Sequence, residues 1–367
     1  MEYDAPLFFH VMDYAGQADR DVIDMVSGNP DWGSPPSLAD GLHEYADLGG
    51  RDFQYPPSHG LRELREEIAT RRNVDVERVI VTNGGGEANY LAMAGALETR
   101  SGSEFVLTDP VYPYYPGKTR MLGATPRFVA TAPDGTLDPA DVRKTASDET
   151  AAIVINSPNN PTGAVYDEET MSELVSIAEA YDALLISDEV YDHFDFSGTF
   201  TSALTVDSDS YVVTNSFSKT LAITGFRVGY AILPDDQDMI ERARGRHMLV
   251  NVAGPRPSQY AVLHALRNVD PEYHERTRKL LYDRVRTFTD ALDAAGAQYT
   301  EPKGSFYVMA RFDGFPGTLE NVERLIDDAG VAGMPGRGFG ESREDWFRFA
   351  LVTPRVEEAA ERLAEYF

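Results

Sequence analysis

The chain has 367 residues, of which 42% are hydrophobic, enough apolar material for two separate hydrophobic cores. Its 60 acidic and 33 basic residues give a formal net charge of −27, which disfavours nucleic acid and anionic membranes as partners because like charges repel. There are no cysteines, so the sequence excludes disulfides and thiolate metal sites. Such acidity is typical of intracellular proteins from salt-loving organisms, and we expect a cytoplasmic protein.

The sequence also argues against membrane insertion and metal binding. The first 20 residues open on acidic residues and contain only a short apolar patch, unlike a signal peptide. No apolar run is long enough to span a bilayer. The seven histidines are scattered and form no metal-binding pair, so we expect no metal site.

Taken in order, the chain begins with a segment, 1–36, that we predict to be irregular and to turn at Gly28. Helices are expected over 38–46 and 61–72, and another after the three glycines at 84–86. Further along the chain, strand-like and helix-like segments alternate. Strands are predicted at 78–82, 104–109, 151–156, 183–191, 210–217 and 228–234, with helices at 168–181, 235–249 and 257–267. This alternation favours an α/β fold with a mostly parallel, doubly wound sheet.

From residue 271 the pattern changes to one long helix, followed by strands near 304–312 and 346–352 and two more helices. We therefore predict a large domain of residues 37–270 and a smaller α+β domain of residues 1–36 and 271–367. Ligands of open parallel sheets bind beyond the carboxyl ends of the strands. The polar segments that follow the predicted strands should therefore converge on one site.

The most informative segment is residues 211–229, YVVTNSFSKTLAITGFRVG. An apolar strand there ends in a hydroxyl-rich turn that carries a single lysine, Lys219. An amine held at a strand end can form a Schiff base with an aldehyde cofactor, since burial lowers the pKa of lysine. The alternative is a solvated surface lysine, the usual state of this side chain. This segment alone leaves both interpretations open.

Three other features point to a charged ligand. Asp188 ends an apolar strand, and a buried carboxylate needs a partner such as a cationic cofactor ring nitrogen, near which Tyr191 could lie. The glycines at 84–86 stand between a strand and a helix start, where backbone amides favour a phosphate. Arg227 suits bidentate phosphate contacts. The plainer alternatives are a helix-cap or loop carboxylate for Asp188, ordinary packing for Tyr191 and a surface ion pair for Arg227, and the glycines alone are a weak signal. Neither dinucleotide-binding nor P-loop spacing is present.

These motifs together resemble the class I/II aminotransferases, which are pyridoxal-phosphate enzymes of fold type I. The resemblance runs from about residue 28 to residue 348 and is carried by SPNNPTG, SDEVYDHF and SFSKTLAITGFRVG, in the family's order and spacing. It implies pyridoxal 5′-phosphate as the cofactor. It also implies a ping-pong Schiff-base exchange of an amino group between an α-amino acid and a 2-oxo acid, with 2-oxoglutarate as the expected acceptor.

The resemblance implies roles for individual residues around the cofactor ring. Lys219 would hold the cofactor aldehyde and move a proton between the substrate Cα and the cofactor. Asp188 would pair with the ring nitrogen, while Tyr191 and Asn160 would bind the ring hydroxyl. Tyr112 matches the residue that would stack on the ring. The cofactor phosphate would be bound by Gly85, Gly86, Ser216, Ser218 and Arg227.

Substrate and subunit contacts follow from the same resemblance. Arg348 would clamp the substrate α-carboxylate, with the Gly28 backbone nearby. An arginine inside the apolar strand WFRFALV needs an anionic partner, which a structural ion pair would also supply. Tyr55 matches a tyrosine that reaches the phosphate of the partner subunit, which implies a homodimer with shared active sites.

Two departures from the family pattern affect specificity. Glycine at position 86 leaves no side chain there to contact the phosphate. No second arginine is matched for an acidic substrate side chain, since Arg246 and Arg256 are only unmatched candidates, so a dicarboxylate-specific enzyme is not predicted. A C–S lyase or decarboxylase would use the same cofactor motifs and is the alternative function. A non-catalytic protein on this fold is disfavoured by the intact set of motif residues.

Overall fold

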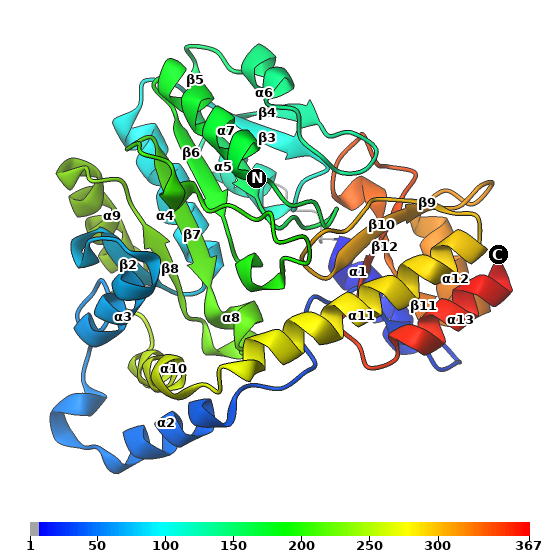
Figure 1. Ribbon diagram of the computed structural model, residues 1–367, viewed down its shortest axis with the longest axis horizontal. Coiled ribbons are helices and arrows are strands. Elements are labelled where there is room, and N and C mark those ends of the chain that lie inside the picture. Colours follow the sequence, from blue (N-terminus) through cyan, green and yellow to red (C-terminus); the bar gives the residue numbers. More distant parts are fainter. Residues whose placement is uncertain (1–6) are drawn as a thin grey trace.

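The computed structural model describes residues 7–367, and its centre is a seven-stranded sheet in the order β2-β8-β7-β6-β5-β3-β4 (Figure 1). Neighbouring strands are parallel from β7 to β4, whereas β8 is antiparallel to both β2 and β7. The predicted mostly parallel α/β sheet is therefore confirmed. Its strands are β2 (Val79–Thr82), β3 (Glu104–Asp109), β4 (Thr125–Ala130), β5 (Thr150–Asn156), β6 (Leu184–Asp188), β7 (Tyr211–Ser216) and β8 (Gly229–Ile232).

Helices cover both faces of this sheet, so every residue of β5, β6 and β7 is buried. The large sheet and its helices form the first hydrophobic cluster, which has one layer on each face of the sheet. Val213 packs in the layer that includes side chains of α3, α6, α7 and α10, whereas its neighbour Val212 packs in the layer beneath α4, α5 and α9. Successive side chains of a strand point to opposite faces, which explains the continuous apolar runs in the sequence. The helices are α3 (Arg62–Arg72), α4 (Gly85–Thr99), α5 (Tyr114–Met121), α6 (Pro139–Thr145), α7 (Glu168–Ala180), α9 (Gln237–Asn251) and α10 (Arg256–Asn268), which also packs on α2 (Pro36–Asp47).

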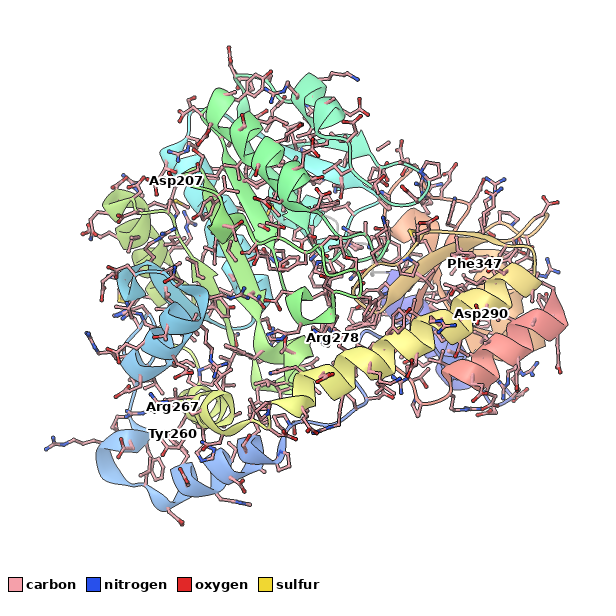
Figure 2. All side chains as sticks on the ribbon, viewed as in Figure 1. Asp207, Tyr260, Arg267, Arg278, Asp290 and Phe347 are labelled. Atoms are coloured by element: carbon pink, nitrogen blue, oxygen red, sulfur yellow. The ribbon has the colours of Figure 1, made fainter. Side chains whose placement is uncertain are left out.

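A second hydrophobic cluster lies beside the first and combines residues 11–26 with residues 285–363. Its antiparallel sheet has the order β12-β13-β10-β9, and β1 pairs with β11. Phe347 of β13, labelled in Figure 2, is fully buried there. The elements are β1 (Ile23–Asp24), β9 (Gln298–Tyr299), β10 (Tyr307–Arg311), β11 (Val331–Ala332), β12 (Met334–Pro335), β13 (Phe347–Ala350), α12 (Leu319–Ala329) and α13 (Val356–Tyr366). The domain boundaries at 36/37 and 270/271 stay a prediction, and residues 1–6 lie outside the described residues.

Helix α11 (Glu272–Ala294) connects the two clusters, since Tyr273 near its start packs in the first and Phe288 near its end packs in the second. Figure 1 shows it running from α10 and α8 to a position alongside α13. Arg278 and Asp290, labelled in Figure 2, lie on its exposed side. No helix within residues 7–367 combines the length and the apolar character needed to cross a bilayer.

The N-terminal segment differs from the expectation of irregular structure, because residues Leu7–Gln17 form helix α1. Its buried residue Val11 and its neighbour Leu7 pack in the second cluster, against α12 and β12. The four-residue spacing of these apolar side chains is the helical signal that the sequence analysis missed.

Two strands also end earlier than predicted, and this decides where the site residues lie. Strand β6 ends at Asp188, so Tyr191 lies in a loop, and β7 ends at Ser216. Lys219 therefore lies in a short helix, α8 (Phe217–Thr220). The Ser216 hydroxyl caps this helix by accepting a hydrogen bond from the Ser218 amide at 3.0 Å.

Candidate active site

A cavity of about 580 Å³ opens at the carboxyl ends of β5, β6 and β7 and is lined from both hydrophobic clusters. Every residue that the sequence analysis placed in the site lines it, with one exception, Tyr55. The residues brought together are Gly28, Gly85, Gly86, Tyr112, Asn160, Asp188, Tyr191, Ser216, Ser218, Lys219, Arg227 and Arg348. They lie up to 320 positions apart in the chain, so the fold alone gathers them.

Lys219 projects its amine into the cavity, where Nζ donates a hydrogen bond to the Gly28 carbonyl at 2.5 Å. Burial lowers the pKa of Lys219 to about 8, and the positive charges of Arg348 and Arg227 act in the same direction. This environment disfavours the alternative of a solvated surface lysine. A sizeable fraction of the amine is therefore neutral, and so nucleophilic, at physiological pH.

Asp188 is 5% exposed and lies on the strand next to the one that leads to Lys219. Its Oδ2 accepts hydrogen bonds from Asn89 Nδ2 at 2.7 Å and from the Tyr115 hydroxyl at 2.6 Å. Its Oδ1 accepts only from the Val190 amide, at 3.2 Å. Burial raises the pKa of Asp188, while the Tyr115 and Asn89 hydrogen bonds oppose that rise. No salt bridge joins this carboxylate to a cation within residues 7–367, so the site suits a ligand that brings a positive charge.

Two polar side chains near Lys219, those of Asn160 and Tyr191, can form more hydrogen bonds than they do. Asn160 is 4% exposed, and its Oδ1 has no hydrogen-bond partner within residues 7–367. The Tyr191 hydroxyl donates to the Tyr307 hydroxyl over a long distance of 3.4 Å, and burial raises the pKa of Tyr191 well above its ordinary value. Buried polar atoms are normally satisfied, so these two side chains mark a place where a polar ligand binds.

The start of α4 forms an anion-binding cradle. Gly84 has a φ of +77°, and a Cβ at this position would lie 2.5 Å from Nη2 of Arg227, so only glycine fits. The amides of Gly85 and Gly86 belong to the first helical turn, where intrahelical acceptors are lacking. Arg227 has a left-handed φ of 58°, a conformation that costs about 1 kcal/mol or more in a non-glycine residue and is typical of functional sites.

The two serines of the Lys219 segment stand beside this cradle. Their hydroxyl oxygens, Ser216 Oγ and Ser218 Oγ, are 2.8 Å apart, and both side chains line the cavity. A Cβ on Gly85 would contact the Ser216 side chain at 3.4 Å, which shows how closely the helix start and the serines approach. Amides, hydroxyls and a guanidinium thus surround one space, the donor set that a phosphate requires.

Arg348, on β13, is 5% exposed and stacks between two aromatic rings, 4.8 Å from the centroid of Tyr307 and 5.1 Å from that of Phe339. Its Nη2 donates to the Val26 carbonyl at 2.6 Å, and its Nε is buried without a partner. No carboxylate pairs with it in the described part of the chain. The guanidinium is held in place but its charge is uncompensated, which favours an anionic ligand.

Gly28 allows the close approach of Tyr307. A Cβ at this position would lie 2.1 Å from the Tyr307 hydroxyl and 3.6 Å from Lys219 Nζ. Any side chain would therefore displace the aromatic ring that packs on Arg348. The close contact, and not a need for a left-handed turn, explains glycine at this position.

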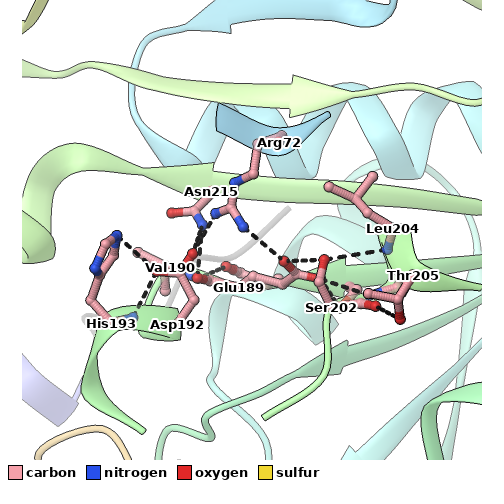
Figure 3. A network of polar contacts seen from close by, with 12 residues as sticks. Arg72, Glu189, Val190, Asp192, His193, Ser202, Leu204, Thr205 and Asn215 are labelled. Carbon is pink, nitrogen blue, oxygen red and sulfur yellow. Dashed lines mark hydrogen bonds and ion pairs between the residues drawn. The ribbon is translucent and has the colours of Figure 1, made fainter. Parts of the chain in front are cut away.

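A buried polar network holds the Asp188 strand against the Lys219 strand (Figure 3). Arg72 of α3 is ion-paired with Asp192 and lies 3.6 Å from the carboxylate of Glu189. Asn215 of β7 donates to Asp192 at 3.0 Å, and Glu189 accepts from the Ser202 hydroxyl at 2.8 Å. Burial raises the pKa of Glu189 to about 7, whereas Arg72 lowers it. Glu189 therefore points away from the cavity and has a structural role, unlike Asp188 beside it.

Three residues that the sequence suggested as candidates, Tyr55, Arg246 and Arg256, do not line the cavity of their own chain. Tyr55 is 81% exposed. Arg256 donates to Asp52 at 2.9 Å, and Arg246 is ion-paired with Glu98. Neither arginine therefore offers an unpaired guanidinium to the site.

The cavity residues that the sequence analysis did not place in the site include four with polar or charged side chains near Asp188 or Arg348: Asn89, Tyr115, Lys118 and Tyr307. Asn89 is a buried polar residue of helix α4, three residues after Gly86, and it directly precedes a mostly apolar run, which was the available signal. Lys118 lies 5.1 Å from the Tyr114 ring centroid, and burial lowers its pKa, with Asp188 acting in the opposite direction. Tyr115 and Tyr307 resemble ordinary core tyrosines in sequence, so only the tertiary contacts reveal them.

The fold and the site define an α/β enzyme in which a buried amine, an unpaired carboxylate and an unpaired guanidinium face one cavity. The chain belongs to the class I and II aminotransferase family, whose model matches residues 20–365. It is 32% identical to the aspartate aminotransferase of Thermotoga maritima, over 95% of this chain and 92% of that protein. The predicted family, fold and aminotransferase activity are confirmed.

Solved structures agree with this assignment. A double mutant of the Thermus thermophilus aspartate aminotransferase superposes with a TM-score of 0.91 at 29% identity, covering 100% of this chain and 97% of that one. YbdL from Escherichia coli, described with a methionine aminotransferase function, superposes with a TM-score of 0.90 at 25% identity, covering 99% and 97%. Proteins with different named substrates thus share this fold, so the fold leaves the amino donor open.

Proposed function

We propose that the protein transfers an amino group from an α-amino acid to a 2-oxo acid with pyridoxal 5′-phosphate as its cofactor. One observation carries this proposal: Asp188 is buried, without a salt bridge to any residue within 7–367, on the strand next to the one that presents Lys219. The residues fit this cofactor. Asp188 Oδ1 would accept from a protonated ring nitrogen, and the unsatisfied Asn160 Oδ1 and the Tyr191 hydroxyl suit the ring hydroxyl.

The remaining cofactor contacts follow from the cradle at the start of α4. The amides of Gly85 and Gly86, the hydroxyls of Ser216 and Ser218, and the Arg227 guanidinium would hold the phosphate. Tyr112, half-buried in the cavity wall, would lie against the ring. When bound, this cofactor supplies an aldehyde that accepts an amine and a ring that withdraws electrons from the substrate Cα.

Lys219 is the group that handles protons. With a pKa of about 8 it is deprotonated in a usable fraction of molecules near neutral pH, so Nζ can take a proton from the substrate Cα and return it. Its hydrogen bond to the Gly28 carbonyl orients the amine. Arg348 binds the substrate α-carboxylate, and the aromatic rings of Tyr307 and Phe339 exclude water from that contact.

We also propose that the protein is a homodimer with shared sites. Tyr55 follows a short 3₁₀ helix (Gly50–Phe53), and Phe53 and Leu48 in the same region are 54% and 37% exposed. An apolar surface of this kind suits contact with a second copy, in which Tyr55 would reach the partner's phosphate site. A location in the cytoplasm stays a prediction.

The test is the visible spectrum of the purified protein with pyridoxal 5′-phosphate, before and after addition of single amino acids without a 2-oxo acid. The lysine-bound cofactor should absorb at long wavelength, and a suitable amino acid should replace that band with the stable band of the aminated cofactor. Lys219→Ala should lack the first band. A band that persists while pyruvate and ammonia appear would establish a lyase, and an unchanged spectrum in Lys219→Ala would exclude this lysine.

A further inference from the structure

Apolar side chains line the cavity beside Arg348. Val26, Met334 and Phe339 come from the second hydrophobic cluster, and Leu7 and Phe8 of α1 also line the cavity. Figure 1 shows α1 beside the antiparallel sheet that carries Arg348. We refer to these five side chains as the apolar wall.

The geometry directs the substrate side chain toward this wall. Phe339 stacks on the guanidinium of Arg348, and Met334 is the strand partner of Arg348. A Cβ on Gly338 would contact Met334 Cε at 3.7 Å and Leu7 Cδ1 at 3.8 Å, so the two apolar side chains close around this point. An amino acid whose α-carboxylate is bound by Arg348 therefore places its side chain next to apolar groups.

Among the described residues of one chain, a second carboxylate finds no free cation beside this wall. The basic side chains that line the cavity, within residues 7–367, are Lys118, Lys219, Arg227 and Arg348. Lys219 is the proposed cofactor-binding lysine, and Arg227 lies at the proposed phosphate site at the start of α4. Lys118 lies near Asp188, on the side of the proposed ring nitrogen, and packs on Tyr114. Arg348 is thus the one guanidinium that faces the substrate in this part of the chain.

The cost of desolvation distinguishes amino acids with a second carboxylate from those with a large apolar side chain. A carboxylate placed against apolar side chains loses its hydration and gains no partner, which is strongly unfavourable. A large apolar side chain in the same place buries its own surface and gains free energy. The arginines that might have served a second carboxylate, Arg246 and Arg256, are paired with Glu98 and Asp52 outside the cavity.

We propose that the amino donor carries a large uncharged side chain, aromatic or long aliphatic, and is not a dicarboxylic amino acid. This inference rests on the proposed function and specifies its substrate class. It separates this chain from the relatives that are named for aspartate, although they share its fold and family. Because the acceptor occupies the same cavity in the second half of the exchange, phenylpyruvate should also react faster than oxaloacetate, and the same argument disfavours 2-oxoglutarate, the acceptor expected from the family resemblance.

The experiment is a set of single-turnover half-reactions of the full-length holoenzyme, mixed with L-phenylalanine, L-methionine or L-aspartate and followed by the loss of the long-wavelength band. We expect the ratio of the maximal rate constant to Kd to be at least about tenfold higher for phenylalanine or methionine than for aspartate. A higher ratio for aspartate would overturn the inference and leave the aminotransferase function intact. If no amino acid converts the cofactor, the proposed function itself fails.

A matched pair of variants tests the apolar wall directly. Met334→Arg introduces a guanidinium beside Arg348 and should raise the ratio for aspartate relative to phenylalanine by at least about tenfold. Met334→Leu keeps the wall apolar and should preserve the order of the three amino acids. An unchanged order in Met334→Arg that still binds the cofactor would show that the substrate side chain lies elsewhere. If Met334→Arg does not fold, the ranking of the unmodified enzyme decides.

Discussion

The lowered pKa of Lys219 predicts how the apoenzyme captures its cofactor as pH changes. Only the neutral amine attacks an aldehyde, and burial lowers the pKa of this amine to about 8 from its ordinary value of 10.5. At pH 7.5 about a quarter of the molecules carry neutral Lys219, against about one in a thousand for an unshifted lysine. Burial therefore increases the reactive fraction roughly 200-fold.

The direction of the pH dependence follows from this shift. The rate of capture should rise as pH increases through about 8 and then level off, because above that pH the amine is already neutral. Stopped-flow measurement of the long-wavelength band, after mixing the apoenzyme with pyridoxal 5′-phosphate from pH 6 to about 10, gives the midpoint. The same cofactor mixed with N-acetyl-lysine corrects for titration of the cofactor itself.

A charge-removing variant separates the causes of the shift. Arg348 is the largest charge contribution to the lowered pKa, after burial. Arg348→Met should therefore move the midpoint to higher pH. A midpoint near 10 in the unmodified protein would refute the assignment of a buried, nucleophilic Lys219. A midpoint that stays at 8 in Arg348→Met would show that Arg348 does not contribute and would leave burial and Arg227 as the causes of the shift.

Three further substitutions test the supports of the site. Arg72→Met leaves the buried carboxylates of Glu189 and Asp192 without their cation, so the free energy of unfolding should fall by about 3–5 kcal/mol. Urea titration measures this change, and near-normal stability would contradict the ion-pair network. Tyr115→Phe removes a hydrogen bond to the Asp188 carboxylate, a loss of about 1.5–3 kcal/mol, so the Kd for the cofactor should rise about 10- to 100-fold by fluorescence titration. Tyr55→Ala and Lys219→Ala should each be impaired alone, whereas co-expressed mixed dimers should regain activity because one of their two sites has both residues intact. Mixed dimers without activity would argue against shared sites.

Local sequence information predicted the large-domain fold and most of the site. The strands are continuous apolar runs because helices cover both faces, so their positions can be read from residue type alone. The polar segments that follow them had to meet, since the carboxyl ends of parallel strands share one edge of a sheet. The family motifs then named Lys219, Asp188, Asn160 and Arg348, and each lines the cavity.

Tertiary structure decided which neighbours these residues have. Asn89 and Tyr115 bind Asp188 only because α4 and α5 pack on the face of the sheet beneath β6. Gly28 and Lys219 are 191 positions apart in the chain, and they come into contact because the second cluster packs against the first. No local pattern in the sequence encodes that contact. Periodicity reports which face of an element is buried but not what it is buried against. The apolar wall beside Arg348, and with it the preferred substrate, could therefore be inferred only from the folded chain.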